Sequence, residues 1–282
     1  MTMYAHNPQR AVVKAIEQVM RNGTMSSPRG QDTYELLGAQ IRVDFPAQFV
    51  YEIEGRDLKH GIGILEGLQL VAQTSLPSVM TRQFKVFARW TDGSIFDGAY
   101  GVRAHGMIRR VIEQIDKDRD TRQAVITIFD SSRDLHTVSA DVPCTLSLQF
   151  VLRQDQLHMI TTMRSNDVWR GLPYDLMQFM LLQHVIADHF GVQLGTYTHN
   201  VGSLHLYGSD LEQAEHILAV SQRVDESFDF PRPLFTGDTY ADAVRRAELL
   251  LLRAADQGTA IGLGTMTLFE GYAFATLMER AR

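Results

Sequence analysis

The chain has 282 residues, 45% of them hydrophobic and 21% charged, which is the composition of an ordinary globular protein with a substantial core. Its net charge of -6 argues against a broad nucleic-acid-binding surface, and its single cysteine excludes an internal disulfide. We expect a cytoplasmic protein, because the N-terminus lacks the apolar core of a signal peptide and no apolar run approaches the roughly 20 residues of a membrane span.

Hydrophobic spacing predicts two helices and a strand in the N-terminal third of the chain. The helices cover Pro8–Asn22 and Asp57–Ala72, where apolar residues recur at helical intervals. Between them, a Gly- and Pro-bearing loop carries Arg29 and precedes a strand over Tyr34–Val43. The following segment, Ser78–Trp90, mixes β-branched, aromatic and basic residues and allows no assignment.

The middle of the chain contains the clearest strand patterns. Asp92-Gly93 predicts a turn, and Tyr100–Asp118 has the spacing of one amphipathic helix. A strand is expected over Ala124–Phe129. Two further strands, Thr145–Arg153 and Gln156–Arg164, are close enough in sequence to form a hairpin.

The C-terminal half begins with a long, largely apolar helix over Leu172–Phe190, which Gly191 ends. Helices and strands are mixed without a regular βαβ rhythm, so we expect a single α+β domain over residues 1–282 with a large mixed sheet. The remaining expected elements are a β-rich segment over Val192–Leu206, an extended connection over Phe228–Pro233, and helices over Gly208–Leu218, Tyr240–Ala254 and Phe269–Arg282.

The only cysteine, Cys144, follows Pro143 directly and stands at the head of the predicted hairpin. The returning strand can bring Arg164 back beside it, because paired strands lie about 5 Å apart. This arrangement suggests a nucleophile with an anion-binding arginine and a carboxylate nearby. In the alternative, Cys144 is a small buried hydrophobe, which is the more common role of a lone cysteine.

Two other charged residues also allow a structural and a functional interpretation. Glu66 lies within the apolar stripe of a predicted helix, where it either points outward at the helix boundary or acts as a general acid/base in a closed site. Arg29 is either a solvated loop charge or part of a binding site. The sequence contains no Gly-rich phosphate loop and no Cys/His spacing typical of a metal site, so we expect no metal.

Four motifs, in this order and at these separations, resemble the thymidylate synthase family, which includes the pyrimidine-nucleotide hydroxymethylases. They are Pro143-Cys144, Arg164-Ser165-x-Asp167-Val168, Gly171-Leu172-Pro173 and His205-x-Tyr207. The resemblance runs from about Ala11 to Tyr207 and fades toward the C-terminus. It implies a thymidylate synthase-like fold, with a large mixed sheet flanked by helices and a homodimer formed through the sheet.

The resemblance also implies a role for each site residue. Cys144 would add to carbon 6 of a pyrimidine nucleotide, Glu66 would handle protons through water, and Asp167 would contact the folate. An arginine cluster suits a phosphate because guanidinium is always charged and forks onto its oxygens, and its positive field should favour the thiolate. The implied nucleotide contacts are Arg29, Arg164 and Ser165 with the 5′-phosphate, Arg122 with the phosphate of the neighbouring subunit, and His205 and Tyr207 with the sugar hydroxyl.

The implied chemistry explains why a nucleophile is needed. Carbon 5 of the pyrimidine is a poor nucleophile until a thiolate adds at carbon 6 and turns it into an enamine carbon. That carbon can attack the methylene of 5,10-methylenetetrahydrofolate. Loss of tetrahydrofolate leaves an exocyclic methylene, which hydride would convert to a methyl group and water to a hydroxymethyl group.

Asp175 departs from the synthase pattern, which has asparagine after Gly-Leu-Pro-aromatic. A carboxylate accepts from the amino group of cytosine, whereas an ionised carboxylate facing a uracil carbonyl opposes two acceptors at a cost of roughly 1–3 kcal/mol. Within the family, this aspartate resembles the deoxycytidylate hydroxymethylases. In the alternative, Asp175 only caps a helix that begins near Leu176.

Other departures concern the partner phosphate and the closure of the site. Thr145 stands where synthases usually have histidine, and Gln123 replaces the second arginine of the usual pair. The residue that would shield the methylene intermediate cannot be placed in Phe87–Trp90. The C-terminal residues from Phe274 onward do not resemble the closing tail of the synthases, and a looser lid would admit water and favour hydroxymethyl transfer.

We therefore expect a deoxycytidylate (dCMP) hydroxymethylase that uses methylenetetrahydrofolate and water, with no membrane or nucleic-acid partner. The rival enzymes are a cytidylate (CMP) hydroxymethylase of a nucleoside natural-product pathway and a dCMP or dUMP methylase. A different class of function is an inactive relative that binds nucleotides or RNA. The intact Cys144, Glu66 and arginine set argues against that class, as does the acidic charge balance.

Overall fold

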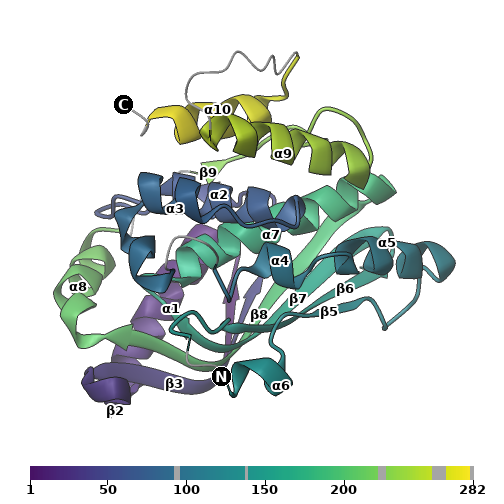
Figure 1. The fold of residues 1–282 in the computed structure, drawn as a ribbon. Coiled ribbons are helices and arrows are strands. Elements are labelled where there is room, and N and C mark those ends of the chain that lie inside the picture. The colour runs from purple at the N-terminus through teal and green to yellow at the C-terminus, as the bar shows by residue number, and fades with distance from the viewer. Residues whose placement is uncertain (92–95, 137–138, 222–226, 256–264, 280–282) are drawn as a thin grey trace.

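Within the described residues, a seven-stranded mixed sheet runs through the molecule in the order β1-β3-β8-β7-β6-β5, with β2 paired to β3 (Figure 1). This computed structural model describes residues 1–91, 96–136, 139–221, 227–255 and 265–279, so the turn predicted at Asp92-Gly93 lies outside them. The pairs β1·β3 and β7·β8 are parallel and the others antiparallel, which confirms the expected α+β fold with a large mixed sheet. The strands are β1 (Thr2–Ala5), β2 (Thr24–Ser26), β3 (Thr33–Val43), β5 (Val125–Thr127), β6 (Thr145–Arg153), β7 (Gln156–Asp167) and β8 (Gln193–Tyr207), with β4 (Val50–Tyr51) and β9 (Ser227–Phe228) in a separate pair.

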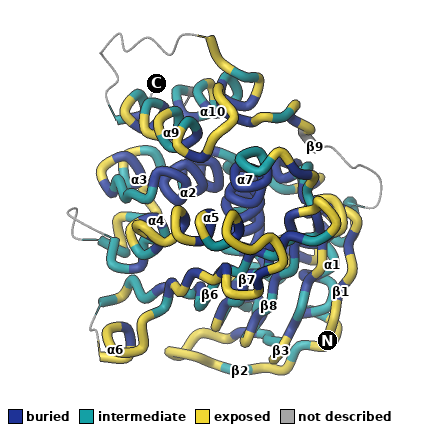
Figure 2. The backbone as a smooth tube through the Cα atoms, turned by 90° about the vertical axis from the view of Figure 1, so that its right-hand side faces the viewer, coloured by how far each residue is buried: buried dark blue, intermediate teal, exposed yellow. Residues whose placement is uncertain are grey.

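The strand register gives the sheet one buried face and one open face. Side chains alternate between faces along a strand, so neighbouring cross-strand rows face opposite ways. One row is buried throughout, and its members from β5 to β1 are Ile126, Leu148, Thr161, His199, Ile41 and Met3. The next row is exposed or half-exposed, and its members in the same order are Val125, Gln149, Ile160, Thr198, Arg42 and Tyr4. Figure 2 shows most of the helices stacked on one side of the sheet.

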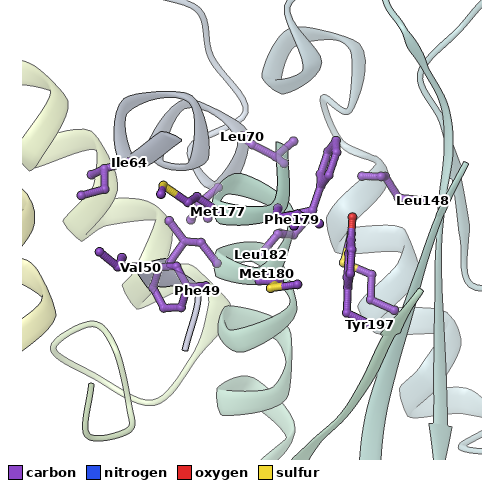
Figure 3. Close-up of a cluster of buried hydrophobic side chains, with 14 of the residues drawn as sticks. Phe49, Val50, Ile64, Leu70, Leu148, Met177, Phe179, Met180, Leu182 and Tyr197 are labelled. Atoms are coloured by element: carbon purple, nitrogen blue, oxygen red, sulfur yellow. The ribbon is translucent and has the colours of Figure 1, made fainter. Parts of the chain in front are cut away.

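Helix α7 (Leu172–Phe190) forms the centre of the core on the covered face. Pro173 in its first turn and the left-handed Gly191 after its last residue are ordinary helix start and stop signals. Its side chains are buried on nearly every side, and Phe179, Met180 and Leu182 pack among residues from α2, β6 and β8 (Figure 3). A helix that is apolar all round belongs in the interior of a protein.

The other helices form layers around α7. Helix α1 (Pro8–Asn22) lies beside it on the sheet, α2 (His60–Val71) crosses its outer side, and α9 (Tyr240–Ala255) and α10 (Leu268–Glu279) cover α2 (Figure 1). None of the helices in the described part of the chain combines the length and apolar composition that a membrane span requires. The shorter helices are α3 (Pro77–Gln83), α4 (Tyr100–Arg103), α5 (Met107–Lys117), α6 (Ser131–Asp134) and α8 (Leu211–Val220), with 3-10 turns η1 (Pro28–Gly30), η2 (Lys85–Trp90) and η3 (Gly208–Asp210).

Several boundaries differ from the sequence-based expectations. The helix predicted over Tyr100–Asp118 is two helices, because the chain turns at Gly106, whose φ of 72° lies in the left-handed region. The sequence did not indicate the short strands β1, β2, β4 and β9, which carry too few residues for a period-two pattern. The last predicted helix ends at Glu279 within the described residues, and positions 280–282 lie outside them.

Close contact between α2 and α7 sets the position of Glu66 relative to the start of α7. A Cβ on Gly63 would lie 2.8 Å from the Cβ of Met177, and a Cβ on Gly67 would lie 2.8 Å from Cδ2 of Leu181. Both glycines therefore let the helices approach more closely than any larger residue would. Glu66 lies between these glycines on the same helix.

We expect Gly63→Ala to lower the free energy of unfolding by about 1–3 kcal/mol, because the added methyl group overpacks the interface against a backbone-proximal atom. The matched control is Gly271→Ala in α10, where a Cβ would meet nothing within 4 Å. That variant should gain up to about 1 kcal/mol, because alanine is the better helix former. Urea denaturation measures both, and equal stability changes in the two variants would contradict the close packing.

Candidate active site

One cavity of about 1520 Å³ opens between α2, the start of α7, the ends of β7 and β8, and the loop around Arg29. This volume exceeds the roughly 300–1,000 Å³ typical of a pocket for one small ligand, so it offers room for two. Arg122 is exposed ahead of β5 and does not line the cavity. All the other predicted site residues line it, namely Arg29, Glu66, Cys144, Arg164, Ser165, Asp167, Asp175, His205 and Tyr207.

The hairpin β6–β7 brings Arg164 beside Cys144, as its register predicts. The backbone N–H of Arg164 donates to the carbonyl oxygen of Cys144 at 2.8 Å. The Arg164 guanidinium donates to the carbonyl oxygens of Pro143 at 3.1 Å and Val142 at 3.0 Å. Arg164 therefore orders the loop that leads into Cys144, in addition to placing a cation at the cavity.

The electrostatic setting of Cys144 differs from the expectation that arginines would favour its thiolate. Burial raises the pKa of the Cys144 thiol, and the carboxyl groups of Asp175 and Asp141 raise it further. Arg164 and Arg29 lower the pKa, as expected from their charge, but burial outweighs them. The protonated thiol is thus the favoured form at neutral pH.

Asp175 lies in the first turn of α7 with its carboxyl group buried. Two side-chain amides contact it: Asn166 Nδ2 donates to Oδ2 at 2.6 Å, and Gln178 Nε2 donates to Oδ1 at 3.0 Å. Burial raises the pKa of Asp175 to about 7, although both amide donors act to lower it. The alternative that Asp175 caps a helix beginning near Leu176 is wrong, because α7 begins at Leu172.

Glu66 approaches the same cavity from α2 and does not point outward from the helix boundary. Burial raises its pKa to about 8, and the nearby carboxyl groups of Asp175 and Asp141 contribute to the shift. Burial also raises the pKa of Asp141, two residues before Pro143. The carboxyl groups of Glu66 and Asp175 therefore hold exchangeable protons near neutral pH, which suits acid/base chemistry.

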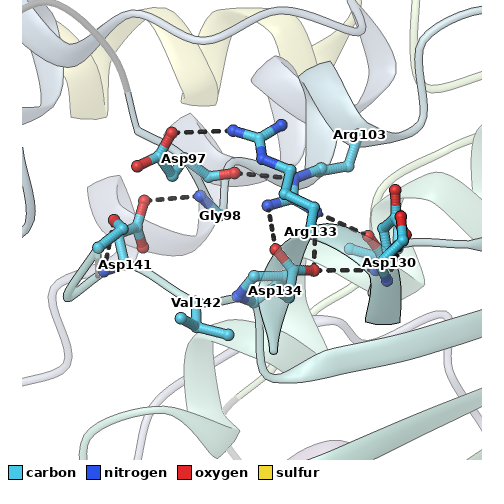
Figure 4. Close-up of polar contacts among 12 residues, drawn as sticks. Asp97, Gly98, Arg103, Asp130, Arg133, Asp134, Asp141 and Val142 are labelled. Atoms are coloured by element: carbon cyan, nitrogen blue, oxygen red, sulfur yellow. Dashed lines mark hydrogen bonds and ion pairs between the residues drawn. The ribbon is translucent and has the colours of Figure 1, made fainter. Parts of the chain in front are cut away.

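Tyr100 reaches the cavity from the short helix α4 and stacks on Phe179 of α7, with ring centroids 5.8 Å apart. At the end of the same helix, Arg103 makes a bidentate ion pair with Asp134 at 2.8 and 2.9 Å (Figure 4). Both partners of this pair are buried. The ion pair anchors α4 and with it the ring of Tyr100.

A second contact of the same network holds the loop before the cysteine. The backbone N–H of Gly98 donates to the Asp141 carboxylate at 2.8 Å (Figure 4). Arg103 Nε donates to the carbonyl oxygen of Asp97, and Arg133 pairs with the Asp97 carboxylate at 2.9 Å. The segment that precedes α4 is thus tied both to α6 and to the loop that ends at the nucleophile.

Another part of the cavity wall is formed by the last residues of β7 and β8 and by Arg29. The rings of His205 and Tyr207 lie on one face of β8, 5.3 Å apart, as strand alternation predicts. Ser165 Oγ lies 3.4 Å from His205 Nδ1, and Arg29 Nη2 lies 3.5 Å from the Tyr207 hydroxyl. The backbone of Arg29 is in the left-handed region, with φ at 57°.

Asp167 has a structural contact in addition to its place in the cavity lining. Its Oδ1 accepts from the backbone N–H groups of Trp169 at 2.7 Å and Arg170 at 3.0 Å. The carboxylate therefore closes the turn that leads into α7. Arg56 lies over the Trp169 ring, 4.2 Å from its centroid, and extends the cavity wall beyond this turn.

Sequence reasoning assigned no role to four residues that the structure brings into the site: Tyr100, Asp141, Asn166 and Gln178. Gln178 carried a usable signal, because residues three apart on a helix share a face and it follows Asp175 by three. Asn166 is the variable position of the motif Arg164-Ser165-x-Asp167-Val168. No local signal indicated Tyr100 or Asp141, since their approach depends on the fold of the segment before the hairpin.

Among the described residues, no group of three or more His, Cys, Asp or Glu side chains is placed to hold a metal ion. The chain belongs to the thymidylate synthase family, because residues 11–233 match the model of that family. The chain is similar to the deoxyuridylate hydroxymethyltransferase of Bacillus phage SP01, with 27% identity over 249 residues that cover 80% of this chain. The same match covers 65% of the phage protein, so this chain spans about two thirds of that relative's length.

The raised pKa of Asp175 predicts a pH-dependent gain in stability for Asp175→Asn. Between about pH 4 and 7 the carboxyl group is neutral in the folded chain and ionised in the unfolded chain, so the folded state binds the extra proton and stability falls as pH rises. Asparagine does not titrate. The advantage of the variant should therefore grow over this interval, to a limit on the order of 4 kcal/mol, and stay level above pH 7.

Asp134→Asn is the matched control, because Arg103 holds the pKa of Asp134 below its ordinary value. The Asp134 carboxylate is ionised in the folded chain throughout pH 5–8, so the loss caused by this substitution should stay nearly constant over that range. Urea denaturation at several pH values measures both variants. A flat difference for Asp175→Asn would contradict a raised pKa at that residue.

Proposed function

We propose that the protein transfers a one-carbon unit from 5,10-methylenetetrahydrofolate to carbon 5 of dCMP, with water capture giving 5-hydroxymethyl-dCMP and tetrahydrofolate. The observation that carries this proposal is the buried carboxyl group of Asp175 in the cavity that Cys144 also lines. Membership of the thymidylate synthase family supports one-carbon transfer. Similarity to a phage hydroxymethyltransferase supports addition of water to the transferred carbon as the last step.

In this proposal, the sulfur of Cys144 forms a bond to carbon 6 of the pyrimidine. Carbon 5 then bonds to the methylene carbon while one of its two carbon–nitrogen bonds to the folate breaks, and tetrahydrofolate leaves from the other once the proton on carbon 5 has been removed, which gives the exocyclic methylene. A base removes the proton from carbon 5, for which Glu66 acting through water is the proposed group. Water then adds its oxygen to the exocyclic methylene, and the sulfur–carbon bond breaks. The sum converts dCMP, methylenetetrahydrofolate and water into the two products with no external reductant.

The raised pKa values of Cys144 and Glu66 support their proposed roles in this reaction. The pKa of the Cys144 thiol is raised by burial, so the sulfur must lose a proton before it adds to the ring. Glu66, with a pKa of about 8, can take up and release a proton at physiological pH. Raised pKa values of this kind cluster at functional sites because burial and like charges are brought together there.

The base assignment follows from the chemistry of Asp175. Its carboxyl group accepts from the cytosine amino group, and in its neutral form it also donates to the ring nitrogen. The nucleotide phosphate is assigned to Arg29, Arg164 and Ser165, which line the cavity, and the sugar to His205 and Tyr207. The folate is assigned to the part of the cavity that Asp167 lines.

A second candidate is hydroxymethylation of dUMP, which the printed name of the phage relative favours. A neutral Asp175 could donate to the uracil carbonyl and accept from the ring N–H, as asparagine does. An ionised Asp175 cannot, so this candidate requires the protonated carboxyl group.

We expect dCMP, incubated with methylenetetrahydrofolate, to give hydroxymethyl-dCMP by mass spectrometry, with at least tenfold lower turnover of CMP and dUMP. Asp175→Asn should reverse the preference between dCMP and dUMP. Cys144→Ser is the control for chemistry and should abolish release of tritium from carbon 5 of dCMP. Product from dUMP alone would refute the base assignment, and unchanged tritium release would remove Cys144 from its role.

We further propose that two copies pair through the open face of the sheet and that Arg122 completes the phosphate site of the partner. The exposed and half-exposed row that includes Val125, Ile160 and Tyr4 offers an extended surface, and no helix among the described residues covers it. Arg122 lies outside the cavity of its own chain, which suits action in the other subunit. The same face would then account for the exposure of these apolar side chains.

Mixing two inactive variants tests this arrangement. Cys144→Ser and Arg122→Ala, each inactive or weak alone, should recover about a quarter of wild-type activity after subunit exchange. Half of the exchanged chains form mixed dimers, and each mixed dimer has one site with an intact cysteine and an intact partner arginine. A mixture of Cys144→Ser with Arg164→Ala is the control, because Arg164 lines its own cavity. The Arg164 mixture should not recover, and an Arg122 mixture that fails to recover in the same way would place Arg122 in its own subunit.

A further inference from the structure

Asn166 lies on β7 between two residues already assigned to the site, and it lines the cavity while only 4% exposed. Its Nδ2 donates to the Asp175 carboxylate at 2.6 Å and lies 3.1 Å from Met163 Sδ. Its carbonyl oxygen, Oδ1, is buried and has no hydrogen-bond partner in the part of the chain that the structure describes. A buried acceptor without a donor costs roughly 1–3 kcal/mol, so such an atom calls for an explanation.

The orientation of this amide is determined by its neighbour. If the Asn166 side chain were reversed while Asp175 is ionised, Oδ1 would face Oδ2 of Asp175 at hydrogen-bonding distance, and two acceptors would oppose each other. Gln178 occupies the other carboxylate oxygen with a donor of its own. The carbonyl of Asn166 is therefore a fixed acceptor beside Asp175, while the amide nitrogen is already used.

We propose that Asn166 is a second base-recognition residue, whose Oδ1 accepts one N–H of the cytosine amino group while Asp175 engages the other and the ring nitrogen. The inference rests on the proposed cytosine substrate. A cytosine amino group has two N–H donors, and one carboxyl group at the pairing edge of the base satisfies only one of them. Uracil presents a carbonyl oxygen at the same place, which would oppose Oδ1 and leave both acceptors without a donor.

Asn166 also supplies what Asp175 lacks. A carboxyl group that changes protonation near neutrality can match either base, because its neutral form both donates and accepts. The carbonyl of an amide does not titrate, and while an ionised Asp175 holds Nδ2, Oδ1 of Asn166 can only accept. Discrimination between an amino group and a carbonyl oxygen at this place therefore depends on Asn166 as well as on Asp175.

A comparison of two ligands against two variants tests the proposal. The ligands are dCMP and the deoxynucleotide of 2-pyrimidinone, which lacks the amino group, and calorimetry measures their dissociation constants. Asn166→Leu removes the amide at nearly constant side-chain volume. It should raise the dissociation constant of dCMP by about tenfold and change that of the pyrimidinone nucleotide by no more than about twofold. Equal losses for both ligands, or no loss for dCMP, would overturn the proposal.

Gln178→Leu is the matched control, because it removes the other amide donor from Asp175. If Gln178→Leu loses affinity for dCMP but not for the pyrimidinone nucleotide, that loss acts through Asp175. The corresponding loss of affinity in Asn166→Leu must therefore be larger. An equal or smaller loss in Asn166→Leu would also overturn the proposal. If Asn166→Leu fails to fold, as judged by circular dichroism, Asn166→Ala takes its place in the same comparison. If the wild-type protein binds dUMP and not dCMP, the proposed substrate is wrong. If the wild-type protein turns over dCMP selectively but the Asn166 variant binds dCMP as tightly as the wild type, only the proposed role of Asn166 is wrong.

Discussion

The burial of one carboxyl group at the start of α7 is the constraint on which the cavity depends. Asp175 is only 8% exposed, too little for water to stabilise its charge fully, and two amides from different elements contact its carboxyl group. Those amides lower the cost of ionisation without cancelling it, and the pKa remains near 7. The group is thus able to accept, donate or change between the two at physiological pH. A surface carboxylate, which stays ionised, would present only acceptors.

The same burial governs the other titratable groups of the cavity. Cys144, Glu66 and Asp141 come from separate segments, and each has a raised pKa because water is excluded from the space they share. Arg164 and Arg29 lower the pKa of the thiol, but with less effect than burial. The cavity therefore holds titratable carboxyl groups, the thiol and the positive charges of Arg164 and Arg29 in one shared space.

Packing and ion-pair contacts hold the side chains of the cavity in fixed positions relative to one another. The two glycines of α2 allow Glu66 to approach the start of α7 closely, and the ion pair of Arg103 with Asp134 fixes α4 and Tyr100. Asp141 links the α4 segment to the loop that Arg164 orders from the other side. Each support lies on an element that contributes a cavity residue, so a shift in one support would move a reacting group. None of these contacts involves the residues on the open face of the sheet.

Local sequence patterns by themselves determined much of this protein. The limits of α1, α7 and β6, and the contact of Arg164 with Cys144, follow from residues near one another in the chain, because helix periodicity, caps and hairpin register are local properties. The motifs around Cys144 and Asp167 indicated the family. Tertiary structure alone decided that two helices replace the one predicted after Tyr100, that Asn166 and Gln178 surround Asp175, and that burial outweighs the arginines at the thiol. These features depend on how much water is excluded when distant segments meet, and no pattern within one segment carries that information.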